Sequence, residues 1–296
     1  MLSDIIIIIP THKRQHYLNR VAWYYSHFDM QVYICDSTPE TAFEIDKYDN
    51  INYLWCPDKT FYTKILFVLN TTDADFYATS PDDDFLKYET LLECYKAMKN
   101  DRSYSMGVGG QIVFDEHFEN KTFRYIDGAN AFANIKLEGT PLSRILAVFS
   151  NYQNLLWSLF RKDVIAVTFT QLIERSYSSQ NFIELSLAFM AASLGNIYLS
   201  NNYLNFREST KNEHWGKLEK TISLKNIVRY GNLRKDSLSF VFNNPKKCLR
   251  FIGLFRYLLC SSIFYQWKNE KKDAQSVLFV TDDAMASMIQ EALLHS

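Results

Sequence analysis

Three consecutive carboxylates, Asp82, Asp83 and Asp84, follow an apolar stretch that starts at Phe76. Adjacent like charges repel, so their position at the end of a buried strand predicts a positively charged partner. Oxygen-rich sites suit Mg²⁺, Mn²⁺ or Ca²⁺, and a magnesium-type ion is commonly held by one or two carboxylates plus substrate phosphates. The stretch alone leaves a second interpretation open, a solvated turn at Pro81 with acids in the first turn of a helix.

The hydrophobic pattern predicts the elements that would position these carboxylates. Apolar runs at residues 5–9, 31–35, 51–55 and 76–79 predict strands. Helical spacing of apolar residues at 18–25 and 65–69 predicts two intervening helices. This order is that of an α/β fold with a mostly parallel sheet. Because ligands bind at the carboxyl ends of parallel strands, we expect Thr11, Asp36 and the three aspartates to line one crevice.

The second half of the chain continues this pattern with less regularity. A helix is predicted after Asp84, and residues 104–114 predict a strand whose three glycines favour close packing over a ligand cradle. Residues 115–134 predict a loop-rich segment on the substrate side. A helix over residues 179–194 should end at Gly195, and short strands follow at 197–199 and 203–206.

Composition narrows the classes of function. A hydrophobic fraction of 47% supports a packed core, and a formal net charge of -1 argues against a nucleic-acid binder. Neither a P-loop nor a dinucleotide-binding glycine motif occurs, so a carboxylate-held metal would have to bind phosphate. The five cysteines form no C-x-x-C pair and predict reduced thiols and a cytoplasmic location. The five isoleucines before Pro10 predict a strand, not a membrane anchor.

The order of these features resembles the family-2-like nucleotide-sugar glycosyltransferases of the GT-A fold, in particular a bacterial branch that acts in surface-polysaccharide assembly. The resemblance covers roughly residues 3–215. It rests on five stretches: residues 5–14 (IIIIIPTHKR), 35–37 (CDS), 82–85 (DDDF), 184–187 (ELSL) and 203–209 (YLNFRES).

The resemblance implies roles for individual residues of a donor site. The loop of Pro10, Thr11 and Arg14 would hold the nucleotide together with Asp36, which would accept a hydrogen bond from the base. The stretch from Asp82 to Asp84 would bind the donor through a D-x-D motif, in which Asp82 and Asp84 bridge the diphosphate through Mn²⁺ or Mg²⁺ and Asp83 lies between them. His214 resembles a late histidine that completes this metal site, although a surface position beside Trp215 is an equal alternative. The implied donor is a nucleotide-diphosphate sugar, with a UDP-sugar favoured, and the acceptor is a glycan or lipid-linked glycan.

The sequence departs from the family at the general base. Inverting members carry Glu-Asp where this chain has Asn181 and Phe182. Glu184 is the nearest carboxylate, so Glu184 and Asp84 are the candidate catalytic residues, with Glu174 and Asp163 as weaker candidates for the base. A positioned base would remove the proton of the acceptor hydroxyl. Inversion is favoured over retention, and the departure leaves both open.

Four further residues have both a functional and a structural interpretation. Lys64 and Arg207 could neutralise diphosphate or acceptor charge, or lie solvated at the surface. Tyr152 and Trp157 could stack on sugar rings, or belong to the core.

The pattern divides the chain into two parts. Residues 1–215 would form the GT-A-like catalytic domain, with a nucleotide-binding half (1–100) and an acceptor-side half (101–215), and residues 216–296 a mainly helical extension. The aromatic stretch 246–267 is interrupted by Arg256, which makes it a poor spanning helix. It would lie on an anionic membrane surface, or pack on the catalytic domain or on a second copy in a homodimer.

Two other classes of function remain open from the sequence. The same carboxylates could serve a metal-dependent nucleotidyl or phosphoryl transferase. The missing family base also leaves a non-catalytic nucleotide- or carbohydrate-binding protein as an alternative.

Overall fold

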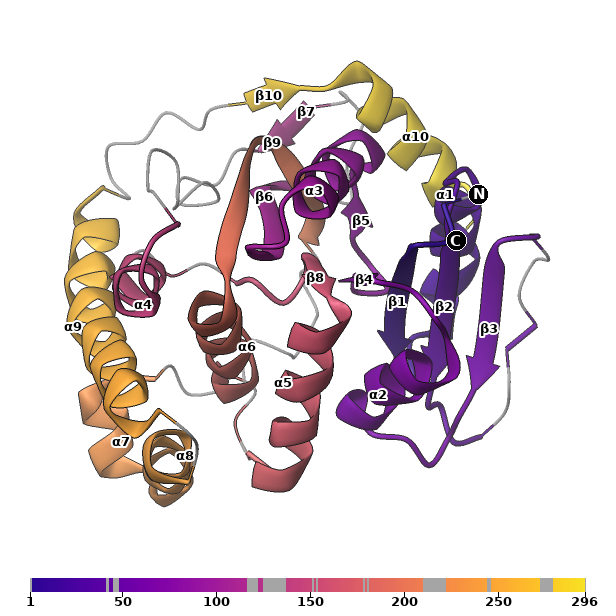
Figure 1. The fold of residues 1–296 in the computed structure, drawn as a ribbon. Coiled ribbons are helices and arrows are strands. Elements are labelled where there is room, and N and C mark those ends of the chain that lie inside the picture. The colour runs from indigo at the N-terminus through magenta and orange to yellow at the C-terminus, as the bar shows by residue number, and fades with distance from the viewer. Residues whose placement is uncertain are drawn as a thin grey trace.

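A single sheet runs through the molecule, with helices on both of its faces (Figure 1). The computed structural model describes residues 2–40, 43–44, 48–115, 122–124, 137–150, 152, 154–177, 179, 181–209, 222–243, 246–271 and 279–295. Ten strands of these residues belong to the sheet. Their bounds are β1 (Ile5–Thr11), β2 (Gln31–Asp36), β3 (Ile51–Trp55), β4 (Phe76–Thr79), β5 (Phe85–Leu86), β6 (Tyr104–Asp115), β7 (Thr122–Arg124), β8 (Leu159–Arg161), β9 (Asn196–Ser209) and β10 (Phe279–Thr281).

The helices of the described residues fall between these strands and at the end of the chain. Their bounds are η1 (Gln15–Tyr17), α1 (Leu18–Ser26), α2 (Phe61–Thr71), α3 (Tyr88–Asn100), α4 (Pro141–Ser150), α5 (Lys162–Arg175), α6 (Asn181–Leu194), α7 (Leu224–Arg229), α8 (Gly231–Phe242), α9 (Lys247–Lys271) and α10 (Asp283–Leu293). The strands and helices predicted before Asp84 are all present.

The N-terminal strands form the parallel part of the sheet. β1 pairs in parallel with β2 and with β4, and β2 pairs in parallel with β3. The isoleucines of β1 alternate between two core clusters: Ile5, Ile7 and Ile9 pack with α1, and Ile6 and Ile8 pack with α2. Burial on both faces explains why this strand is a continuous apolar run.

Beyond β4 the sheet becomes mixed. The path of neighbouring strands is β10-β7-β6-β8-β4-β1-β2-β3. β8 is antiparallel to both β4 and β6, whereas β9 runs parallel to β6 and antiparallel to β5. Parallel pairing is thus confined to the β1–β2, β2–β3, β1–β4 and β6–β9 pairs.

Glycines in β6 allow other elements to approach its backbone closely, as the sequence predicted. A Cβ atom added at Gly107 would lie 2.7 Å from Cβ of Cys94, and one at Gly109 would lie 2.7 Å from Cβ of Leu204. α6 ends at Leu194, before Gly195 as predicted. Gly195 does not end the helix in a left-handed conformation. A glycine is required here by close packing, since an added Cβ would lie 2.6 Å from the carbonyl oxygen of Ser103.

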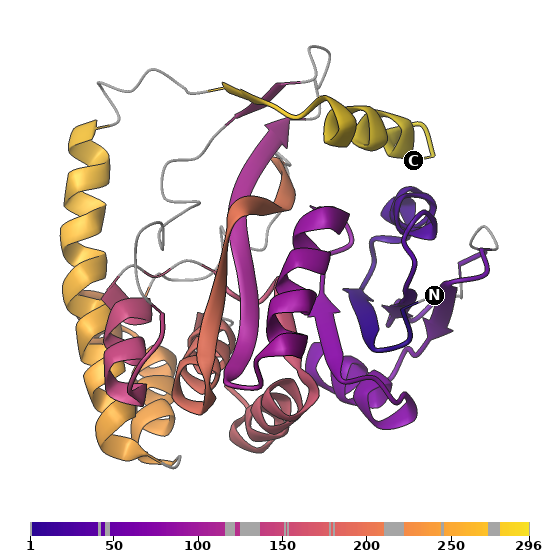
Figure 2. The same ribbon diagram turned by 45° about the horizontal axis from the view of Figure 1, so that its top comes forward.

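The C-terminal part of the chain returns to the sheet and to α1. α9 packs on α4 and α8, and β10 adds an antiparallel strand to β7. α10 then packs on α1 (Figure 2). At this contact the hydroxyl of Tyr24 lies 3.3 Å from Sδ of Met285. The boundary predicted near residue 215 falls within 210–221, which lie outside the described residues.

Candidate functional site

The three aspartates after β4, the acidic cluster (Asp82, Asp83 and Asp84), are buried rather than solvated. Thr11, at the end of β1, donates a hydrogen bond from Oγ1 to Oδ2 of Asp82 at 2.6 Å. The parallel register pairs Thr11 with Asp36 of β2. The strand ends predicted to share a crevice therefore lie together, and the interpretation of the cluster as a solvated acidic turn is wrong.

Two arginines supply part of the positive charge that the acidic cluster needs. Arg14 places Nη2 2.6 Å from Oδ2 of Asp83 and Nε 3.3 Å from Oδ1 of Asp82. Arg20 of α1 forms a buried ion pair with Glu208 of β9 and donates to the carbonyl oxygen of Asp83 at 3.0 Å. Partly buried Arg14 and buried Arg20 thus compensate part of the charge of these four carboxylates.

Asp84 is almost fully enclosed and accepts few hydrogen bonds for a buried carboxylate. Its Oδ1 accepts a hydrogen bond from the backbone N–H of Glu208 at 2.9 Å, the one hydrogen bond that the described residues donate to it. Burial, and next the negative charge of Asp83, raise the pKa of Asp84 well above its ordinary value. A carboxylate in this state gains the most from a nearby cation.

Asp36 has the opposite environment. Oδ1 accepts hydrogen bonds from the backbone N–H and the hydroxyl of Thr38, at 2.8 and 2.6 Å. Oδ2 accepts from Gln15 at 2.7 Å and from the hydroxyl of Tyr53 at 2.8 Å. Burial alone would raise the pKa of Asp36, but these hydrogen bonds outweigh it and lower the pKa below its ordinary value. A bound base would have to replace one of these donors.

Lys64 of α2 is buried behind the same strand ends. Its Nζ donates to the carbonyl oxygen of Thr11 at 2.6 Å and to Oγ of Ser37 at 2.9 Å. Burial lowers the pKa of Lys64. The alternative of a solvated surface lysine is therefore wrong, and its ammonium group holds the loops that follow β1 and β2.

Glu184 lies in the first turn of α6, partly buried. Asn154 donates to its Oε1 at 3.1 Å, and the hydroxyl of Tyr152 lies 3.5 Å from Oε2. Burial and next the charge of Glu184 raise the pKa of Tyr152 well above its ordinary value, so the phenol stays a donor to the carboxylate.

Hydrogen bonds connect Glu184, through Asn154 and Leu156, to Thr79 at the end of β4. Asn154 also accepts from the backbone N–H of Leu156 at 2.7 Å, and the carbonyl oxygen of Leu156 accepts from the hydroxyl of Thr79. Thr79 ends β4, three residues before Asp82. Asn181 and Phe182, the positions where the sequence resemblance implies Glu-Asp, start the same helix, and Phe182 is fully buried in the core.

The remaining predicted residues differ in their exposure. Pro10 lies in β1, partly exposed. Arg207 in β9 is exposed, as its solvated interpretation requires, and its positive charge also acts on Asp84 and opposes the rise in the pKa of that carboxyl. Tyr152 and Trp157 are partly buried against the core. Trp157 accepts a hydrogen bond at its carbonyl oxygen from Asn205 at 3.0 Å.

The described residues supply only part of the predicted metal site. Asp82 and Asp84 offer the hard oxygen ligands that suit a divalent cation. Among the side chains that the structure describes, no group of three or more His, Cys, Asp or Glu is arranged to hold a metal ion. His214 lies outside the described residues.

Sequence reasoning missed Arg20 and the role of Glu208. Glu208 was part of the family-like YLNFRES stretch, but its ion pair with Arg20 joins positions 188 residues apart. The one sequence signal for this ion pair was the position of Arg20 among the apolar residues of the predicted helix. An arginine that is buried at such a position requires an acidic partner.

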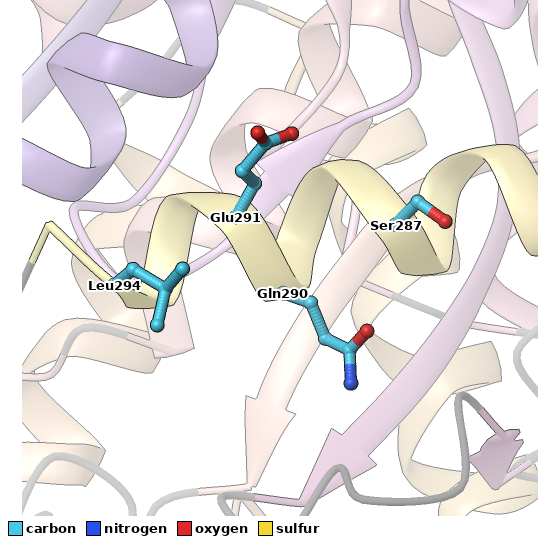
Figure 3. A pocket seen from close by; sticks show the side chains of 4 residues that line it. All are labelled: Ser287, Gln290, Glu291 and Leu294. Carbon is cyan, nitrogen blue, oxygen red and sulfur yellow. The ribbon is translucent and has the colours of Figure 1, made fainter.

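A surface pocket lies apart from the candidate site. Figure 3 shows an open pocket on α10, lined by Ser287, Gln290, Glu291 and Leu294, which contains none of the predicted site residues. Within the described segments, no helix combines the length and the apolar character needed to cross a membrane.

Comparison with known proteins identifies the fold. No protein-family model matches the sequence, and no curated protein matches it. The structure is similar to crystal structures of S. aureus TarS residues 1–349. For the complex with UDP-GlcNAc, the TM-score is 0.57 at 11% identity, over 98% of this chain and 79% of that chain. For the complex with UDP, it is 0.54 at 12% identity, over 86% and 70%. The structure without a named ligand gives 0.56 at 11% identity, over 92% and 75%. The predicted α/β, GT-A-like fold class is confirmed.

Proposed function

We propose that this chain is a glycosyltransferase that moves a sugar from a nucleotide-diphosphate sugar to an acceptor hydroxyl. The observation that carries the proposal is the convergence of Thr11, Arg14 and the acidic cluster at the carboxyl edge of the parallel strands. Ligands of open α/β sheets bind at this edge. The shared fold with TarS, which has been crystallised with UDP-GlcNAc and with UDP, supports a UDP-sugar as donor.

In this proposal the acidic cluster binds the donor diphosphate through a divalent cation. Asp82 and Asp84 would hold Mn²⁺ or Mg²⁺, which would stabilise negative charge on the departing nucleoside diphosphate. Arg14 stands beside both Asp82 and Asp83 and would contribute a second positive charge there. Asp36 and Lys64 would act by holding the loops after β1 and β2 in place, because their polar atoms bond to those loops.

The acceptor half of the reaction would depend on Glu184. Asn154 and Tyr152 hold its carboxylate by hydrogen bonds, and a positioned carboxylate can take the proton of an acceptor hydroxyl as the new bond forms. The acceptor class, a bacterial surface glycan, rests on the sequence resemblance. The five free cysteines agree with synthesis on the cytoplasmic side.

The first test is a thermal-shift panel of nucleotides and nucleotide sugars with and without Mn²⁺. A ligand that binds only the folded state raises apparent stability, by about 2.7 kcal/mol at a hundredfold excess over its Kd. We expect UDP or a UDP-sugar to stabilise the wild type in a Mn²⁺-dependent way, and not the Asp82→Ala/Asp84→Ala variant. A folded wild type that responds to no nucleotide would refute the donor site.

A second candidate, a non-catalytic nucleotide- or carbohydrate-binding protein, is favoured by one observation. Asn181 and Phe182 occupy the positions of the family's acids, and buried Phe182 cannot act as a base. Release of UDP from a stabilising UDP-sugar distinguishes the two candidates. Binding without release of UDP, with water or any glycan acceptor, would favour the binding protein.

A further inference from the structure

The three helices α7, α8 and α9 expose an unusual share of apolar side chains. Of the thirteen large hydrophobic residues that are exposed in the described part of the chain, seven lie in these helices. They are Leu224 and Val228 on α7, Leu238 and Phe242 on α8, and Phe251, Phe255 and Leu259 on α9. The helices pack on one another in sequence and gather at one end of the molecule (Figure 1).

α9 carries apolar side chains well beyond the face that it packs on the protein. Its inner face packs on α4 through Gly253, whose Cα leaves room for Ile145, and through buried Leu254 and Leu258. Its outer face carries an apolar stripe, the outer stripe (Phe251, Phe255 and Leu259), at helical spacing of four residues. These side chains are 56%, 50% and 39% exposed, and the first two rings stack 6.1 Å apart. A soluble surface helix normally presents polar residues on that face.

The charged residues of these helices are almost all basic. Residues 222–260 contain eight basic side chains and one acidic side chain, a net charge of +7 in a chain whose formal net charge is -1. The acidic residue, Asp236, is buried, as is Arg250. Within residues 222–260 the exposed ionic groups are therefore all basic: Lys225, Arg229, Arg234, Lys235, Lys246, Lys247 and Arg256.

We infer that α7, α8 and α9 form a docking surface for an anionic phospholipid bilayer, with the outer stripe inserted at the interface. Basic helices with aromatic and leucine side chains on one face lie in the plane of such interfaces, where apolar burial and attraction to anionic lipid act together. Each Lys or Arg near an anionic leaflet adds to the attraction. A polyanionic polymer would use the charges but would leave Phe251 and Phe255 in water.

The same helix connects this surface to the candidate acceptor site. Tyr257, on the inner side of α9, packs edge-on against Tyr152 with ring centroids 5.3 Å apart. Tyr152 in turn contacts Glu184. Docking would thus hold the Glu184 side of the molecule near the bilayer, which suits a lipid-linked acceptor. This last step rests on the proposed function, whereas the docking surface itself does not.

Vesicle co-sedimentation of the full chain tests the inference. We expect the wild type to bind phosphatidylcholine vesicles that contain phosphatidylglycerol, to bind pure phosphatidylcholine much more weakly, and to dissociate as salt is raised. Phe251→Ser/Phe255→Ser should weaken binding at least about tenfold, because two large apolar side chains no longer insert. Lys225→Glu/Lys247→Glu should weaken it about fivefold or more per charge.

A matched control keeps the test specific. Val167→Ser/Ile173→Ser removes two exposed apolar side chains from α5, outside the docking surface, and should bind as the wild type does. Asp82→Ala/Asp84→Ala should also bind normally, so failure of the donor site and failure of the docking surface are separable. Circular dichroism checks that each variant is folded.

Three results would overturn the inference. The first is a wild type that does not bind anionic vesicles, or binds neutral ones equally well. The second is unchanged binding by folded Phe251→Ser/Phe255→Ser. The third is a wild-type dimer in analytical ultracentrifugation that becomes a monomer in this variant, because a second copy would then cover the outer stripe.

Discussion

Asp36 and Asp84 are both buried at the carboxyl edge of the parallel strands, yet they differ in the hydrogen bonds and charges around them. Asp36 accepts four hydrogen bonds and has a lowered pKa. Asp84 accepts one from the described residues, stands beside Asp83 and has a raised pKa. The number of donors around a buried carboxylate therefore separates the two positions, although both follow a strand in the sequence.

Because of this difference, we expect the two carboxylates to have different roles. A carboxylate whose lone pairs are occupied by its own loop stabilises that loop, and Asp36 fixes the chain around Thr38 and Gln15. A buried carboxylate with few donors costs stability unless a cation arrives. Binding sites are commonly kept at such a cost, because stability and function compete for the same residue. Glu184, which accepts from Asn154 and Tyr152, is intermediate in the number of its hydrogen-bond donors.

The largest expected effect comes from this third carboxylate. Glu184→Gln keeps an oxygen to accept from Asn154 but removes the base, so kcat for sugar transfer should fall by about 10²–10⁴-fold. Thermal stability should change little. Glu291→Gln, at an exposed site on α10, is the matched control and should retain full activity. Equal rates for Glu184→Gln and the wild type would exclude Glu184 as the base.

Asp36→Asn should give the next largest effect, a loss of folding stability. An amide at this position cannot accept from all of Gln15, Tyr53 and Thr38, so the free energy of unfolding at pH 7 should fall by about 1–3 kcal/mol. Because the pKa of Asp36 is lowered in the folded state, its contribution is present above the ordinary carboxyl pKa and lost as pH falls through the folded-state value. Urea denaturation at several pH values measures this.

The exposed Asp58→Asn provides the comparison for that series. The stability gap between Asp36→Asn and the wild type should close at acidic pH, whereas Asp58→Asn should track the wild type throughout. A gap that persists unchanged below the folded-state pKa would mean that the charge of Asp36 contributes nothing.

The sequence predicted this edge of the sheet because local patterns determine it. Continuous apolar runs mark strands buried on both faces, and polar residues directly after them must meet where parallel strands end. The pairing of Thr11 with Asp36 and the bond from Thr11 to Asp82 follow from that rule. The end of α6 was also predicted from a local pattern, a glycine directly after the helix. In the structure, close packing on Ser103 is what requires Gly195.

The parts that sequence reasoning missed depend on distant pairings. Arg20 meets Glu208 only because β9 lies beside β5, and β5 has two residues, too few to show a pattern. β8, with three residues, has the same weakness and turns the sheet from parallel to mixed. The acidic cluster was expected to need a cation, and the two arginines that supply part of that charge could not be identified before the tertiary contacts were known.

The smallest effect expected is a gain of stability at Asp84. Asp84→Asn retains an oxygen that can accept from the backbone N–H of Glu208 but removes a buried negative charge beside Asp83. Without added metal, the free energy of unfolding at pH 7 should therefore rise by about 1 kcal/mol. The same change should abolish stabilisation by Mn²⁺ together with UDP. Opposite signs for Asp84→Asn and Asp36→Asn in one denaturation series would establish the contrast between the two strand ends. If both variants lose stability equally, Asp84 is a structural carboxylate like Asp36, and the cation site would have to be sought elsewhere in the cluster.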